Sequence, residues 1–178
     1  ETDRQIGPVN IMETLTRTVG SSWITVTLSN TYNDMVVVCN PAYSSASRPM
    51  VVRVHNASET SFEVRLQNPG DGSPVTPSPV HCLVIEAGAW TLPDGRKIEA
   101  QKYTSTVTDY ASSSWVGEQQ TYLHSYTNPV VVGQVMTAND PNWSDFWARG
   151  TTSANPPNAG NLWTGKGVCE DTNRTRAD

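Results

Sequence analysis

The chain contains an internal repeat, and the period of that repeat limits the folds it can adopt. The segment around Trp23 reads SSWITVTLSNTYNDMVVV, and the segment around Trp115 reads SSWVGEQQTYLHSYTNPVVV. Both begin with Ser-Ser-Trp, contain a tyrosine further on and end in three valines. The two tryptophans lie 115 − 23 = 92 positions apart. This period is too long for one turn of a solenoid and fits a small β-sandwich, so we expect two related β-domains in tandem.

Strand patterns fill the first copy. Residues 23–28 (WITVTL) alternate between two faces, residues 35–39 (MVVVC) form an apolar run typical of a buried strand, and residues 61–67 (SFEVRLQ) alternate again. Turn-forming residues separate the strands at sandwich spacing, and no amphipathic helix pattern occurs. We therefore predict an all-β fold of two tandem antiparallel β-sandwich domains. The predicted parts are an N-terminal extension or donor strand at 1–12, a first sandwich at 13–95 and a second sandwich at 96–178.

The second copy lacks a counterpart of the closing strand VHCLVIEA within the chain. A sandwich without its last strand exposes an open edge, which a strand from another chain can fill. The segment IGPVNIME ends like CLVIE, so Ile6, Val9 and Ile11 are predicted donor-strand residues. The partner would be a copy of the chain or a tandem neighbour. The alternative is that the chain is cut from a longer polypeptide and this segment is a linker or first strand.

The order of core residues in the first copy resembles that of H-type lectin domains. The residues that carry this resemblance are Trp23, Val26, Leu28, Tyr32, Val36 to Val38, Val52 to Val54, Phe62, Val64 and Leu83 to Glu86. The resemblance implies a six-stranded antiparallel sandwich of glycan-binding ancestry. The stretch that holds a Trp/His pair in that family reads Gln67-Asn68-Pro69-Gly70-Asp71 here, and either Arg48 or Arg53 stands for the family's arginine.

A closer resemblance is to the repeated lectin-like sandwiches of large secreted bacterial proteins. It rests on a pattern near the C-terminus made by Lys166, Val168, Glu170, Asp171, Arg174, Arg176 and Ala177. In those proteins a closing strand follows this pattern. The resemblance implies an extracellular or cell-surface location and a repetitive architecture.

A long segment after residue 137 is rich in tryptophan and asparagine and has little strand pattern. Sugars are bound by aromatic faces together with planar polar side chains. The predicted carbohydrate-binding residues are Trp143, Trp147, Trp163, Asp140, Asp145, Arg149 and Asn161. The alternative is that the tryptophans form a small core within a long loop. No cofactor is expected, although the oxygens of Asn139, Asp140 and Asp145 are also of the type that binds Ca²⁺.

Cysteine and sequon positions suit a secreted protein. Cys39 and Cys82 both lie on predicted strands of the first domain and are candidates for a disulfide, the alternative being two buried thiols. Cys169 has no partner in its own domain and is either free or intermolecular. Asn-x-Ser/Thr sequons, the acceptors of N-glycosylation, occur at Asn56, Asn142 and Asn173.

Composition argues against several functions. The net charge is −5 and 16% of residues are charged, which disfavours a nucleic-acid partner. No apolar run reaches the roughly 18 residues of a membrane span. His55, His81 and His124 lie on predicted strands, GxSxG is absent and no carboxylate pair marks a cleft, so we do not expect an enzyme.

Two functions remain. The first is a structural or adhesive extracellular repeat of lectin-like fold, a subunit or segment of a fibre or large surface protein that assembles by β-strand complementation. The second is a non-catalytic carbohydrate-binding module, with glycans as partners.

Overall fold

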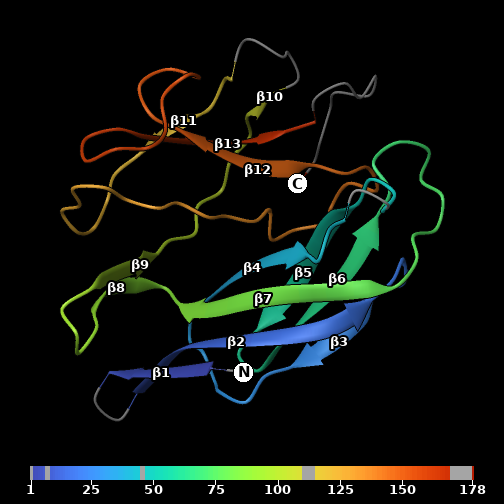
Figure 1. Ribbon diagram of the computed structural model, residues 1–178, viewed down its shortest axis with the longest axis horizontal. Coiled ribbons are helices and arrows are strands. Elements are labelled where there is room, and N and C mark those ends of the chain that lie inside the picture. Colours follow the sequence, from blue (N-terminus) through green and yellow to red (C-terminus); the bar gives the residue numbers. More distant parts are fainter. Residues whose placement is uncertain (1, 7–8, 45–46, 110–114, 169–177) are drawn as a thin grey trace.

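The structure, a computed structural model, describes residues 2–6, 9–44, 47–109, 115–168 and 178. These residues form strands, turns and irregular segments without any helix, which confirms the all-β prediction (Figure 1). Accordingly, no described segment is a helix long and apolar enough to cross a membrane.

Thirteen strands are described. In chain order they are β1 (Thr2–Ile6), β2 (Val9–Val19), β3 (Ile24–Thr27), β4 (Met35–Pro41), β5 (Val51–Ser58), β6 (Ser61–Gln67), β7 (Ser78–Glu86), β8 (Gly88–Thr91), β9 (Lys97–Ala100), β10 (Thr108–Asp109), β11 (Glu118–Gln120), β12 (Asp145–Arg149) and β13 (Leu162–Gly167).

The first half of the chain is a two-layer sandwich. One sheet has the strand order β1-β2-β7-β4 and the other β3-β6-β5, and all neighbours in both are antiparallel (Figure 1). In β2 to β7, alternate residues point into the space between the sheets. Val37, Val84 and Leu15 from one sheet share a single core with Val54 and Phe62 from the other. The alternation visible in the sequence therefore specifies this half.

A disulfide between Cys39 and Cys82 links neighbouring strands of the first sheet. The two residues are directly opposite one another on β4 and β7, with their Cα atoms 4.1 Å apart. Such a short separation is typical of a non-hydrogen-bonded pair, in which the N–H groups point away from the partner strand. The N–H of Cys39, and by the period of two that of Val37, therefore points to the outer edge of β4.

The second half does not repeat this architecture. β8 and β9 form a hairpin, while β13 pairs with β10, β11 and β12 in one small sheet. Among the described residues there is no second layer that would complete a sandwich. The triplet Val130–Val132, the counterpart in the repeat of Val36–Val38 on β4, is not a strand, because residues 121–144 contain none. Pro129 precedes the triplet and Val130 is 91% exposed, so the apolar run has neither a ladder partner nor a core.

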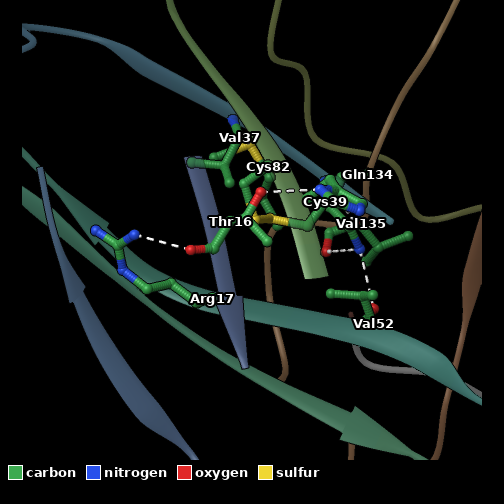
Figure 2. Close-up of a disulfide and its surroundings, with 10 residues drawn as sticks. Thr16, Arg17, Val37, Cys39, Val52, Cys82, Gln134 and Val135 are labelled. Carbon is green, nitrogen blue, oxygen red and sulfur yellow. Dashed lines mark hydrogen bonds between the residues drawn. A yellow bond between two sulfur atoms is a disulfide. The ribbon is translucent and has the colours of Figure 1, made fainter. Parts of the chain in front are cut away.

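We call residues 130–137 the strap, because they run from the second half across the edge of the first sandwich. Gln134 and Met136 on the strap contact β4, as the hydrogen bonds from the Cys39 and Val37 amides show. The close-up in Figure 2 shows Gln134 beside Cys39 and Val52. The second valine triplet of the sequence repeat thus lies in a segment that connects the two halves.

The predicted donor-strand residues lie in the first sheet of their own chain. Ile6 of β1 is paired with Val9 of β2 in a hairpin, and Ile11 of β2 is fully buried. From Met12 onward β2 pairs with β7. β2 therefore begins four residues before the predicted start of the first sandwich at residue 13.

Candidate functional site

Three of the predicted carbohydrate-binding residues come together on one face of the small second sheet. Arg149 on β12 is directly opposite Trp163 on β13, and Trp147 lies two residues earlier on the same face. The guanidinium carbon of Arg149 lies 4.6 Å from the Trp163 ring centroid and 5.9 Å from that of Trp147. Trp115 joins them edge-on, its ring centroid 5.4 Å from that of Trp147. We call these four residues the tryptophan–arginine cluster.

Trp147 occupies a trough made by glycines. A Cβ atom added to Gly165 would lie 2.5 Å from the Trp147 ring, and one added to Gly117 would lie 2.4 Å from it. Gly167, further along β13, also faces this indole. The ring can approach the β13 backbone only because these positions lack side chains.

Backbone carbonyls fix the guanidinium of Arg149. Its Nε donates to Trp115 O at 3.1 Å, and one terminal nitrogen donates to Gly150 O and Thr151 O at 2.9 and 3.1 Å. Arg149 thus ties together the end of β12, the following turn and the residues before β11. These internal bonds favour the interpretation that most of the cluster is a small core, which was the alternative to a carbohydrate-binding site.

One polar atom in the cluster is unpaired. The indole Nε1 of Trp147 is buried and has no hydrogen-bond partner among the residues that the structure describes. Buried N–H groups are normally paired, so an acceptor that reached this nitrogen would satisfy an unmet donor.

Asp140 and Trp143 lie outside the cluster, at the junction between the two halves. Asp140 N donates to the Asp178 carboxylate at 3.0 Å, and Trp143 directly precedes Ser144, whose hydroxyl donates to the same carboxylate. The remaining two predicted carbohydrate-binding residues are Asn161 and Asp145.

Asn161 forms a two-residue bridge with Asn158, and its side-chain amide donates to Asn158 Oδ1 at 3.2 Å. Asp145, at the start of β12, lines a small hollow with Gln134 and Gly133. Although the residue is largely exposed, partial exclusion of water raises the pKa of its carboxyl, and the Phe146 N–H that donates to it opposes this shift.

The junction is centred on Arg53, which is 1% exposed. Its guanidinium pairs with the buried Asp178 carboxylate at 2.8 Å and donates to the carbonyl oxygens of Asn142 and Asp140 at 2.5 and 3.0 Å. Gln67 accepts from Arg53 and donates to Pro141 O. An arginine on the outer face of the first sandwich is thus covered by the second half.

Sequence reasoning missed a second aromatic group, centred on Glu99. Its carboxylate accepts from the backbone N–H groups of Leu123 and His124 at 2.9 and 2.8 Å and from the Tyr126 hydroxyl at 3.2 Å. Loss of solvation, together with the charge of Glu99, raises the pKa of Tyr126 to about 12. This group holds the loop at 121–126 on the β8–β9 hairpin. Its only sequence signal was the density of tyrosine and histidine in that loop.

A third aromatic contact lies on the outer face of the β3-β6-β5 sheet. The Trp23 and His55 rings are stacked with centroids 3.7 Å apart, and Arg65 lies 4.8 Å from the Trp23 centroid. His55 also pairs with Glu63 across the strands at 2.7 Å. The other two predicted structural histidines are also placed: His81 contacts the Thr16 hydroxyl and His124 contacts Trp90 O.

The modification and metal predictions fall in different places. Asn56 is exposed, lies at the bulge between β5 and β6 and has a positive φ of 50°. Asn142 lies at the junction. Asn173, Cys169 and the resemblance residues from Glu170 to Ala177 lie outside the described residues, whereas Lys166 and Val168 are buried. The described residues contain no group of three His, Cys, Asp or Glu side chains able to hold a metal.

Comparison with known proteins gives one relevant similarity. The chain is 30% identical to halomucin of Haloquadratum walsbyi over 126 residues, which cover 66% of this chain. The chain spans only 1% of the length of that protein. No protein family matches the chain, and no solved structure matches it.

Proposed function

We propose that this chain is a structural segment of a large extracellular surface protein. The module bears mechanical load and sets the distance between its neighbours, and it has no catalytic activity. The observation that carries the proposal is the bracing between its halves, where the buried Arg53 is held by Asp178 and by the 140–142 backbone. Within the first half, a disulfide adds a covalent link between strands. Disulfides persist in oxidising, extracytoplasmic environments.

The similarity to halomucin supports the same proposal. Mucins are by name extracellular glycoproteins, and a match to 1% of a very long protein is what a small segment of a surface polymer would give. The sequons at Asn56 and Asn142 agree with a glycoprotein. Assembly through shared β-structure, expected from the sequence, belongs to this proposal.

Surface labelling of the cells that make the protein tests this proposal. Intact cells are treated with a membrane-impermeant amine-reactive biotin reagent, and the protein is then captured with an antibody raised against this chain. We expect biotin on the protein before lysis and loss of the signal after brief protease shaving of the cells. Labelling that appears only after lysis would refute an extracellular location.

A second candidate function, glycan binding, is favoured by one observation, the unpaired Nε1–H of Trp147 beside Trp163. Trp163 is the better test position, because Trp147 fills the glycine trough and its removal would perturb the fold. We expect Trp163→Ala to abolish glycan-array binding, since it removes the aromatic face on which a sugar ring would stack. The variant should melt within a few degrees of the unmodified protein. Trp90→Ala, which removes an indole on β8 outside the tryptophan–arginine cluster, is the matched control and should leave binding unchanged. Equal glycan binding by the unmodified protein and Trp163→Ala would dismiss the site.

A further inference from the structure

The edge of β4 is covered in an unusual way. β4 is the last strand of its sheet, and β5 is the last strand of the facing sheet, so a seam between them opens on one side of the sandwich. β4 and β5 form no ladder with one another. Edge strands of this kind present unpaired N–H groups that another chain can bind.

The outward N–H groups of Val37 and Cys39 on β4 are bonded to side chains of the strap. Cys39 N donates to Gln134 Oε1 at 3.4 Å, and Val37 N donates to Met136 Sδ at 3.3 Å. Two residues after Cys39, the next outward backbone position of β4 is Pro41, which has no N–H group. Every outward donor from Val37 to Pro41 is thus either capped or absent.

The strap also bridges to the other side of the seam. Gln134 Nε2 donates to Val52 O on β5 at 3.1 Å, so one amide side chain joins an N–H of β4 to a carbonyl of β5 (Figure 2). Met136 packs on the apolar core of the sandwich. Residues 134 and 136, which share one face of an extended segment, therefore fill the seam as alternate side chains of a bound peptide would.

The remaining strap residues face other surroundings. Val132 is 59% exposed and lines a hollow of about 380 Å³ with Val38 and Leu83, on the outer face of the first sheet. Gly133 lies against Phe146 of β12, where an added Cβ would be 2.4 Å from the ring. The strap is thus held between the first sandwich and the second sheet.

We propose that the seam between β4 and β5 is a binding site for an extended peptide of the pattern Gln-x-Met, filled in this structure by the chain's own strap, and that the strap of a second copy can fill the same seam. The inference deepens the proposed function and rests on it for its role in assembly. In this proposal the donated segment is residues 134–136, in place of the residues 6–11 predicted from the sequence. The exchange is noncovalent and uses contacts already present within one copy.

Amide hydrogen exchange in the full chain tests the site. In Gln134→Ala we expect the Cys39 amide to exchange about tenfold faster, while the Val37 amide is unchanged. In Met136→Ala the reverse is expected. The Val84 amide on the central strand β7 is the internal reference, and Val130→Thr, at an exposed strap position, is the control variant and should change none of these rates. Because each single variant affects one amide, loss of folding would be recognised by faster exchange at all three.

Addition of a peptide tests exchange between copies. A synthetic peptide with the sequence of residues 129–138 is added to the Gln134→Ala variant, and we expect it to restore protection of the Cys39 amide. The same peptide with alanine at positions 134 and 136 should not. Unchanged Cys39 exchange in Gln134→Ala, or no restoration by the native peptide, would overturn the proposal. Either result would leave the surface-labelling experiment unaffected, so the two proposals fail separately.

Discussion

Glycine at position 165 is the residue on which the tryptophan–arginine cluster depends most directly. It lets the Trp147 ring lie on the β13 backbone, and a methyl group there would lie 2.5 Å from the ring. Gly160, at which an added Cβ would meet nothing within 4 Å, offers a matched comparison.

We therefore predict that Gly165→Ala lowers the free energy of unfolding by about 1–3 kcal/mol, the range for overpacking. Gly160→Ala should change it by less than about 0.5 kcal/mol. Urea denaturation followed by tryptophan fluorescence measures both. A Gly165→Ala variant as stable as Gly160→Ala would show that the trough yields without strain.

Titration of Tyr126 makes the stability of the fold depend on pH. Its pKa is raised from 10.0 to about 12 in the folded state, by loss of solvation first and by the Glu99 charge second. A raised folded-state pKa favours the protonated form, so the stabilisation is complete below pH 10 and is lost as the pH rises toward 12.

The predicted outcome is that stability falls between pH 10 and about 12, and falls less steeply in Tyr126→Phe. Thermal melts across this pH range, together with tyrosinate absorbance, measure the effect. Identical pH profiles for the two proteins would mean that Tyr126 titrates normally.

At the scale of the element, strands of the first half were predictable because alternation and burial agree. Residues 61–67 alternate in sequence, and Phe62, Val64 and Leu66 are buried in β6 as that pattern requires. Residues 130–132 carry the same apolar signal as residues 36–38 but pair with no strand. A strand needs a ladder partner, and local sequence does not encode whether that partner is present.

The candidate site was predictable only in part for a related reason. Arg149 and Trp163 lie 14 positions apart and meet through the β12–β13 register, which no periodicity reveals. Asp140 was predicted with Arg149 as a polar residue of one site, but its backbone carbonyl accepts a hydrogen bond from Arg53 across the two halves. The glycines at 117, 165 and 167 were a usable signal, since glycine in a strand often marks a close approach.

The Cys39–Cys82 disulfide closes a loop with a sequence separation of 43 residues. Removing a crosslink of this span increases the conformational entropy of the unfolded chain.

We predict that the Cys39→Ser/Cys82→Ser double variant is less stable by about 3–4 kcal/mol, measured by chemical denaturation at neutral pH. Intact mass before and after reduction, which differs by two hydrogens for one disulfide, verifies the bridge in the unmodified protein. A variant of unchanged stability would indicate that strand pairing between β4 and β7 alone fixes the loop.

At the scale of the whole molecule, a charged pair is buried between the two halves. Arg53 and Asp178 have side chains exposed by 1% and 0%. Removal of one member of such a pair leaves an uncompensated buried charge.

Arg53→Met should therefore lower stability by about 3–5 kcal/mol and detach the 140–142 segment from the first sandwich. Limited proteolysis should then cut within the strap or the following loop, and calorimetry should show two transitions. Arg48→Met, which loses a surface hydrogen bond to the Ser73 hydroxyl, is the control. A single unchanged transition in Arg53→Met would show that the two halves stay together without this arginine.

The order of segments along the chain has a consequence for biosynthesis. A ribosome finishes β7 at Glu86 and must add 136 − 86 = 50 further residues before Met136 is made. All strands of the first sandwich are by then complete and can fold, since domains form as units during translation. For that interval the outward amides of Val37 and Cys39 face water. During translation on a polysome, the newly folded sandwich of one chain can therefore bind the strap of a neighbouring chain before its own strap is made. The spacing of ribosomes on the messenger would set how often such a pairing between chains forms.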